Sequence, residues 1–196
     1  LLRTDGSHVM VVLLDDTDLA AVMPGLIHGG MHLSGQVCGL LSRILVPRSR
    51  YAEAVELAAT DAAHIAYGDP HDLDTVVGPL VAERQRTRVE GIIAAAVADG
   101  ARAVVGGERP AHLPKGWYVE PTLFGDVDNA MTIAQEEVFG PVMVVIPFDD
   151  DDDAVRIAND SQYGLSGSVV SASEERAVSV ARRLRLAPGE QAVFIE

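Results

Sequence analysis

Short apolar runs alternate with amphipathic stretches along this chain. Three runs are dense in β-branched residues, which predicts buried strands at residues 9–14 (VMVVLL), 43–47 (RILVP) and 142–147 (VMVVIP). Shorter runs predict further extended segments at 103–105, 118–124, 165–170 and 192–195. Strands that are apolar on both faces need cover on both sides. The pattern therefore predicts an α/β fold, a doubly wound open sheet with helices on both faces.

The stretches between these runs have helical periodicity. The predicted helices cover residues 18–33, a stretch after Ser49, and residues 81–98, 151–159 and 174–185. Asp15, Asp16 and Asp18 favour the start of the first helix because carboxylates complement the positive end of a helix dipole. Ser49 is expected to cap the second helix. Gly100 is expected to end the third, since glycine readily adopts the left-handed conformation of a C-terminal cap.

Composition limits the range of functions. The 196 residues carry 15 Lys and Arg against 29 Asp and Glu, a formal net charge of −14 at pH 7, and 48% of them are hydrophobic. A chain of this length and apolar content can bury the core of one large domain. Its acidic surface repels nucleic acids and anionic membranes, so neither is expected as a partner. No run approaches the roughly 20 apolar residues of a membrane helix.

Cys38 is the only cysteine. A single cysteine forms neither an intrachain disulfide nor a cysteine-based zinc site, and this usage favours a reducing compartment, so we expect a cytoplasmic location. Cys38 lies between a predicted helix and a predicted strand, at a connection near an edge of the sheet, where α/β proteins usually bind ligands. A lone cysteine is more often a small buried hydrophobe, so the interpretations as nucleophile and as packing residue both stay open.

Several segments together resemble the aldehyde dehydrogenase superfamily. SGQVC at 34–38, followed by Arg43 and a run ending in Val46-Pro47, is similar to that family's cysteine motif. MTIAQEEVFGPV at 131–142 is similar to its E-E-x-F-G-P-V segment. Weaker matches in the same order are GDP at 68–70, GPL at 78–80, EPTLF at 120–124 and IANDSQYGLSGSV at 157–169. The resemblance extends over about residues 15–185.

The resemblance implies an oxidoreductase that converts a small-molecule aldehyde into a carboxylic acid with NAD or NADP. Cys38 matches the nucleophile, which forms a thiohemiacetal with the aldehyde; loss of hydride to the cofactor leaves a thioester that water hydrolyses. Glu137 matches the residue that hydrogen-bonds the nicotinamide ribose, and Phe139 matches the aromatic residue beside the nicotinamide. The backbone N–H of Cys38 matches part of the oxyanion site.

The chain departs from the family at the position of the general base. Alignment back from residues 15–19 places Thr4 where the family has a catalytic glutamate, with Gly6 and His8 on a glycine and a lysine of the same motif. A threonine hydroxyl does not take a proton from water or a thiol at neutral pH, so this base is absent. Around the cysteine, Met31 and Leu33 stand where the family usually has an aromatic residue and an asparagine.

The chain is also short for the family, whose members are more than twice as long. The resemblance implies that residues 1–196 are the cysteine-bearing catalytic domain, and that the NAD(P)-binding domain and the oligomerisation arm are largely missing. The first residue is Leu1 rather than Met, which favours a piece of a longer protein. Apolar surface that the missing parts normally cover is expected to be exposed, so we expect a homo-oligomer or association with a complementing chain.

Two other functions stay open. Thr4 and the missing cofactor domain also fit a catalytically inactive, truncated paralogue that binds a partner. Acyl transfer to Cys38 needs no nicotinamide, so a residual thiol esterase with slow deacylation is the third hypothesis.

No metal site is expected. His28 and His32 have the spacing of a metal-binding helix, but Gly29 occupies the position of the glutamate in the zinc-protease motif. The acidic run 149–153 lacks the glycine and the spaced ligands of a calcium loop, and it fits the start of a helix instead.

Overall fold

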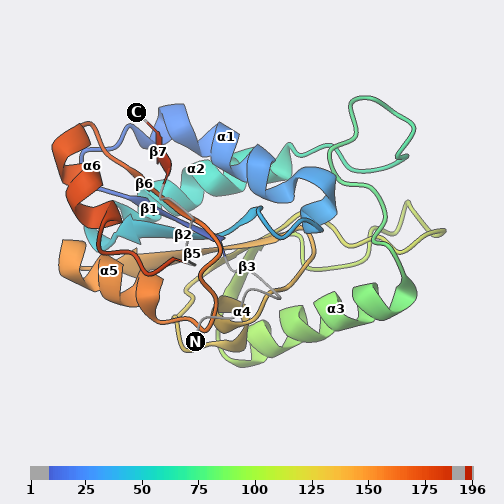
Figure 1. Ribbon diagram of the computed structural model, residues 1–196. Helices are drawn as coiled ribbons and strands as arrows, with labels where there is room; N and C mark the ends of the chain where they lie inside the picture. Colours follow the sequence, from blue (N-terminus) through green and yellow to red (C-terminus); the bar gives the residue numbers. More distant parts are fainter. Residues whose placement is uncertain (1–8, 187–192, 196) are drawn as a thin grey trace.

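The computed structural model describes residues 9–186 and 193–195 (Figure 1). Its helices are α1 (Leu19–Met31), α2 (Tyr51–Ala63), α3 (Glu83–Ala98), α4 (Thr132–Gln135), α5 (Asp151–Asn159) and α6 (Glu174–Ala181). Its strands are β1 (Val9–Leu13), β2 (Leu41–Pro47), β3 (Arg102–Val105), β4 (Thr122–Gly125), β5 (Val142–Phe148), β6 (Gly167–Val170) and β7 (Val193–Ile195). Two short 3-10 helices, η1 (His32–Gly35) and η2 (Arg48–Arg50), follow α1 and β2.

The strands of the described residues form one seven-stranded sheet in the order β3-β4-β5-β2-β1-β6-β7. β3 pairs antiparallel with β4, and every other neighbouring pair is parallel. Parallel neighbours need crossover connections, which the helices supply. The predicted doubly wound α/β sheet is confirmed.

Helices cover both faces of the sheet. α1 and α2 pack on one face, and α3, α4, α5 and α6 pack on the other (Figure 1). Successive residues of a central strand therefore enter different cores: in β1, Val11 packs beneath α1 and α2, whereas Val12 packs on the opposite side. In β2, Ile44 likewise packs on the side of α1 and α2, and Leu45 packs on the opposite side. This two-sided burial explains why these strands are continuous apolar runs in the sequence.

Two of the predicted helix ends are confirmed and one is wrong. The carboxylate of Asp18 accepts a hydrogen bond from the backbone N–H of Ala21 and caps α1. Gly100, at φ +98°, closes α3: its N–H donates to Val97, and the next N–H donates to Ala96. Ser49 does not cap α2. It lies in η2, and α2 begins after Arg50 without a side-chain cap.

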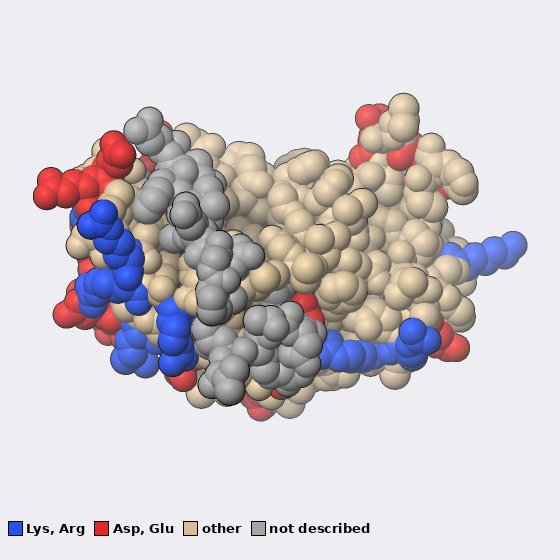
Figure 2. Space-filling model, viewed as in Figure 1, with Lys and Arg blue, Asp and Glu red and all other residues tan. Residues whose placement is uncertain are grey.

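The amino ends and the carboxyl ends of the parallel strands lie on opposite sides of the sheet and are followed by different kinds of residues. The connections from α1 to β2 and from α4 to β5 lie at the amino ends, whereas acidic residues such as Asp15 and Asp149 follow the carboxyl ends of β1 and β5. Figure 2 shows charged side chains gathered on the side of α5 and α6, and an uncharged face over α1. Among the described residues, no helix combines the length and apolarity that a membrane crossing requires.

Candidate active site

Cys38 lies in an exposed turn between η1 and β2. The backbone N–H of Leu40 donates to the carbonyl of Val37 at 3.1 Å and closes this turn around the cysteine. The interpretation of Cys38 as a small buried hydrophobe is therefore wrong. An exposed thiol is accessible to an electrophile, which a nucleophilic role requires.

A left-handed segment leads from α1 into the cysteine turn. Leu33, Ser34 and Gly35 follow one another at φ +50°, +59° and +66°. For residues other than glycine this conformation costs about 1–2 kcal/mol each, so it persists only where contacts hold it. One such contact is the hydroxyl of buried Ser34, which donates to the carbonyl of Gly78 at 3.0 Å.

Glu137 and Phe139 lie in the connection between α4 and β5, both partly buried. Phe139 also has a left-handed backbone, at φ +56°. The following residue, Gly140, touches the cysteine segment directly: a β-carbon built on Gly35 would overlap the carbonyl group of Gly140. The two predicted site segments therefore meet, backbone against backbone.

The meeting point encloses a small cavity of about 20 Å³, enough for one water molecule. Val37 and Leu40, on either side of Cys38, line it from one segment, and Glu137 and Phe139 line it from the other. The structure thus brings together the two segments that contain Cys38, Glu137 and Phe139, although Cys38 itself does not line the cavity. Their chemical roles stay predictions.

Two residues of α3 contact the Glu137–Phe139 connection and were missed by the sequence analysis. The Gln85 side-chain amide donates to the carbonyls of Val138, at 3.2 Å, and Phe139, at 2.8 Å. The Arg88 guanidinium donates to the carbonyl of Val138 at 2.9 Å. No sequence signal marked them, because polar residues in the first turns of an amphipathic helix ordinarily face solvent.

The position of this site in the sheet corrects one expectation. Open α/β sheets usually bind ligands beyond the carboxyl ends of their strands. Cys38 instead precedes the amino end of β2, and Glu137 precedes the amino end of β5. Because β2 and β5 are adjacent interior strands, the two connections lie side by side there rather than at a lateral edge of the sheet.

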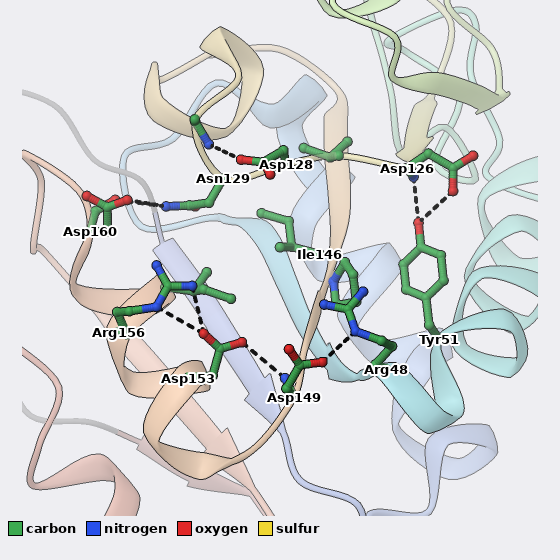
Figure 3. Close-up of a pocket in the computed structure, with 14 residues that line it drawn as sticks. Arg48, Tyr51, Asp126, Asp128, Asn129, Ile146, Asp149, Asp153, Arg156 and Asp160 are labelled. Atoms are coloured by element: carbon green, nitrogen blue, oxygen red, sulfur yellow. Dashed lines mark hydrogen bonds and ion pairs between the residues drawn. The ribbon is translucent and has the colours of Figure 1, made fainter.

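A larger cavity, of about 620 Å³, opens on the side of the carboxyl ends (Figure 3). It runs from the ends of β2 and β5 along α5, and none of Cys38, Glu137 and Phe139 lines it. Two arginines in its wall are paired with carboxylates: Arg48 with Asp149, and Arg156 with Asp153. Asp126, Asp128 and Asp160 also line the cavity, so its wall is acidic overall.

Arg43, part of the cysteine motif, is a buried core residue rather than part of the exposed site. Its guanidinium donates to the side-chain oxygen of Asn129 at 2.9 Å and to the carbonyl of Ala158 at 3.3 Å. Burial lowers the pKa of Arg43 to about 10, and the charge of Asp160 partly offsets this effect. Arg43 thus ties β2 to the connection before α4 and to the end of α5.

The other features that the sequence analysis considered have ordinary structural positions. The ring of His28 in α1 stacks on the ring of His32 in η1 with their centroids 5.9 Å apart. The described residues contain no group of three or more His, Cys, Asp or Glu placed for a metal. Asp150 caps α5 by accepting from the N–H of Asp153, as expected for a helix start. Thr4, at the position of the family's general base, lies outside the described residues.

Exposed apolar side chains surround the cysteine turn. Leu33, Val37 and Val81 are 58%, 39% and 75% exposed, and the N–H of Val81 donates to the side chain of Gln36 at 3.0 Å. Exposed apolar side chains therefore lie on the cysteine segment and on the residue that bonds to it, while their cover by missing parts of the protein and the association expected from it stay predictions.

Comparisons with known proteins identify what this chain is similar to. A sequence model of the aldehyde dehydrogenase family matches residues 2–188. A geranial dehydrogenase of Castellaniella defragrans is 42% identical over 179 residues, and a betaine aldehyde dehydrogenase of Rhizobium etli is 40% identical over 180. Each match covers 91% of this chain but 37% of the relative, so the chain spans little more than a third of these proteins.

Two solved structures are similar over almost the whole chain. An aldehyde dehydrogenase of Mycobacterium tuberculosis, complexed with NAD+, has 46% identity and a TM-score of 0.90, covering 93% of this chain and 38% of its own. A variant of aldehyde dehydrogenase C from Pseudomonas syringae, complexed with NAD+ and octanal, has 40% identity and a TM-score of 0.93, covering 97% of this chain and 39% of its own.

Proposed function

The chain belongs to the aldehyde dehydrogenase family, and we propose that residues 1–196 are the cysteine-bearing catalytic portion of an NAD(P)-dependent enzyme that oxidises a small-molecule aldehyde to a carboxylic acid. One observation carries the proposal: the exposed Cys38 turn and the Glu137–Phe139 connection meet at a shared cavity. The two segments are about 100 residues apart in the sequence, and their contact places the turn that carries a thiol against the connection that carries a carboxylate and an aromatic ring.

The side chains at this meeting point fit the nicotinamide end of the cofactor. The carboxylate of Glu137 offers acceptors for a pair of ribose hydroxyls, and the ring of Phe139 offers a flat apolar surface. When bound, an oxidised nicotinamide supplies the hydride acceptor that aldehyde oxidation needs. The relatives' names and the octanal complex support a small aldehyde as the substrate class.

Cys38 is proposed as the nucleophile. Its Sγ, as the thiolate, forms a bond to the aldehyde carbon while the carbonyl π-electrons move to oxygen, and the backbone N–H of Cys38 stabilises that negative charge. Oxidation of this adduct leaves the acyl group on sulfur as a thioester. Water then attacks the acyl carbon, the C–S bond breaks, and the carboxylic acid and the thiol are released.

Hydrolysis of the thioester is expected to limit turnover by this chain. The same resemblance that assigns Cys38 as the nucleophile places Thr4 at the position where the family has the glutamate that activates water. We therefore expect acylation of Cys38 to outpace deacylation, with a burst of product followed by slow turnover. The esterase hypothesis predicts this burst with activated esters in the absence of NAD(P).

The test separates thiol chemistry from cofactor binding. The purified chain is treated with an activated acyl ester, and intact mass spectrometry is expected to show one added acyl group, which the Cys38→Ser variant lacks. Calorimetric titration with NAD and NADP then tests the cofactor site, and Glu137→Gln is expected to weaken binding about tenfold because it removes a charged acceptor.

The outcomes discriminate the three functions. Aldehyde-dependent reduction of NAD(P) by the wild-type chain, abolished in Cys38→Ser, supports the dehydrogenase. Acylation of Cys38 without any NAD(P) binding favours the esterase or a remnant that needs a complementing chain. A wild-type chain that never forms an adduct at Cys38 contradicts the proposal.

A further inference from the structure

We propose that Ser34 and Gln36 are positioning residues for Cys38, and that they direct its backbone N–H toward the carbonyl group that the thiolate attacks. This inference rests on the proposed function, because it takes Cys38 as the nucleophile and its N–H as part of the oxyanion site. Neither of the two side chains touches the substrate in this proposal. Their loss is therefore expected to slow reactions that need the N–H, but not reactions that need only the thiolate.

Two side chains anchor the segment that leads into the cysteine turn. The hydroxyl of Ser34 donates to the carbonyl of Gly78 at 3.0 Å, and the N–H of Val81 donates to the side-chain oxygen of Gln36 at 3.0 Å. Ser34 is buried, so water does not readily replace its bond. Two residues before the cysteine turn are thus tied to one short segment that lies more than 40 positions further along the chain.

The left-handed backbone of the anchored segment makes these bonds necessary. Leu33 and Ser34 have φ +50° and +59°, a region that residues with a β-carbon rarely adopt. Within the segment, the N–H of Gln36 donates to the carbonyl of Leu33 at 3.2 Å. Relaxation of Leu33 or Ser34 to an extended conformation would swing the cysteine turn that follows. The two anchors oppose this movement, together with the packing of Gly35 against the carbonyl group of Gly140.

The segment to which the side chains are anchored is itself fixed. Leu80 is buried, and its N–H donates to the carbonyl of Trp117 at 3.0 Å. Val77 is also buried; it donates to the carbonyl of Ala66 and accepts from the N–H of Gly68, both at 3.1 Å. Backbone hydrogen bonds and core packing therefore hold the anchor points in place, and the position of the cysteine segment follows from them.

The N–H of Cys38 depends directly on this anchoring. It belongs to the peptide that joins Val37 to Cys38, and this peptide lies one residue beyond Gln36. Because a peptide group is planar and moves as a unit, a change in the backbone at Gln36 redirects the N–H. An oxyanion donor acts from about 2.7–3.1 Å, so a small displacement weakens its effect.

Two reactions of Cys38 separate the direction of the N–H from access to the thiol. With 4-nitrophenyl acetate, the thiolate Sγ bonds to the carbonyl carbon, negative charge builds on the carbonyl oxygen, and 4-nitrophenolate leaves to give an acetyl thioester. With iodoacetamide, Sγ bonds to the methylene carbon and displaces iodide, and no oxyanion forms. Both rates rise with the fraction of thiolate and with its exposure. The ratio of the two rates therefore reports the stabilisation of the oxyanion.

The experiment measures both rates on the purified chain and its variants, with Cys38→Ser as the background. Ser34→Ala removes the hydroxyl donor, Gln36→Met removes the acceptor oxygen at similar length, and Gln36→Glu keeps an acceptor oxygen. Thr17→Val is the matched control. The hydroxyl of buried Thr17 also donates to a backbone carbonyl, that of Val170 at 2.9 Å, but beyond the carboxyl end of β1.

Ser34→Ala and Gln36→Met are each expected to lower the ratio of acetylation to alkylation about threefold, and the double variant about tenfold. Gln36→Glu is expected to keep the ratio within about twofold of wild type, because any effect of the new carboxylate on the fraction of thiolate cancels in the ratio. Thr17→Val is expected to lower the urea midpoint and to leave the ratio unchanged.

Three results would overturn the positioning role. The first is an unchanged ratio in the double variant. The second is an equal fall of the ratio in Thr17→Val, since this would reflect a general loss of stability. The third is a ratio in Gln36→Glu as low as in Gln36→Met, which would show that the acceptor oxygen has no part in the effect.

Failure of the proposed function has a different signature. A wild-type chain that iodoacetamide alkylates at Cys38, but that 4-nitrophenyl acetate does not acetylate, contradicts the nucleophile, and the positioning role fails with it. A wild-type chain that is acetylated at Cys38, with the same ratio in every variant, leaves the nucleophile in place and overturns only the role of Ser34 and Gln36.

Discussion

At the scale of single residues, Gly35 decides how the two site segments approach each other. It ends the left-handed segment at φ +66°, and its missing side chain makes room for the carbonyl group of Gly140. Gly39, on the other side of Cys38, has open space around it and no left-handed φ. The two glycines flank the same exposed turn but only one of them is required by the geometry.

We predict that Gly35→Ala lowers the free energy of unfolding by about 2–3 kcal/mol, whereas Gly39→Ala changes it by less than about 0.5 kcal/mol. The β-carbon of the first variant meets both backbone strain and a clash with Gly140; that of the second meets neither. Urea denaturation followed by circular dichroism measures both. Equal destabilisation by the two substitutions would show that the Gly35–Gly140 contact is unimportant.

At the scale of elements, α3 joins the site to the edge of the sheet. Its first turns contact the Glu137–Phe139 connection, and its last turn ends in the cap formed by Gly100 before β3. Gly91 lies in the middle of the same helix, exposed, with nothing within 4 Å of a β-carbon built on it. The end of this helix therefore requires a glycine just beyond it, whereas the middle of the helix does not.

The same substitution is predicted to act with opposite sign at these two positions. Gly100→Ala places a side chain at φ +98° and is expected to destabilise the protein by about 1 kcal/mol. Gly91→Ala removes backbone entropy from the unfolded chain and is expected to stabilise it by about 0.5–1 kcal/mol. Thermal unfolding midpoints of the two variants, measured side by side, should move in opposite directions; a common direction contradicts the assignment of the cap.

At the scale of the whole molecule, charge is concentrated where the carboxyl ends of the strands meet α5 and α6 (Figure 2). Arg176 of α6 pairs there with Asp15, which follows β1, and with Asp151 of α5. The hydrogen bond from Arg176 holds the pKa of Asp15 below its ordinary value of 3.8. In a chain with a net charge of −14, such a cation also relieves repulsion among neighbouring carboxylates.

We predict that Arg176→Met destabilises the protein by about 1 kcal/mol at neutral pH, a modest value because the pair is partly exposed. The pKa of Asp15 is lower in the folded than in the unfolded state, so its contribution is present above the unfolded value and disappears as the pH falls through the folded value. The difference in unfolding free energy between wild type and Arg176→Met should therefore shrink below about pH 4. A difference that is independent of pH, in a series of urea titrations, would contradict this.

The sequence by itself determined the elements and the chemical groups. Runs such as VMVVLL and VMVVIP specify strands because two-sided burial requires apolar residues at every position, and Asp18 and Gly100 mark helix ends through contacts within a few residues. Sequence motifs that resemble those of the family identify Cys38, Glu137 and Phe139 as site residues, and recognising such motifs requires no knowledge of the fold. These features are local, so local sequence is enough to predict them.

Only the tertiary structure decided where these groups lie and what holds them. The order of the sheet makes β2 and β5 neighbours, and this brings two connections together at the amino ends, opposite to the end where α/β sheets usually bind ligands. The same order brings Gln85 within hydrogen-bonding distance of Phe139, and places Arg43 in the core against Asn129. These contacts join residues 54 and 86 positions apart. They depend on strand order and helix packing, and no pattern within one segment encodes either.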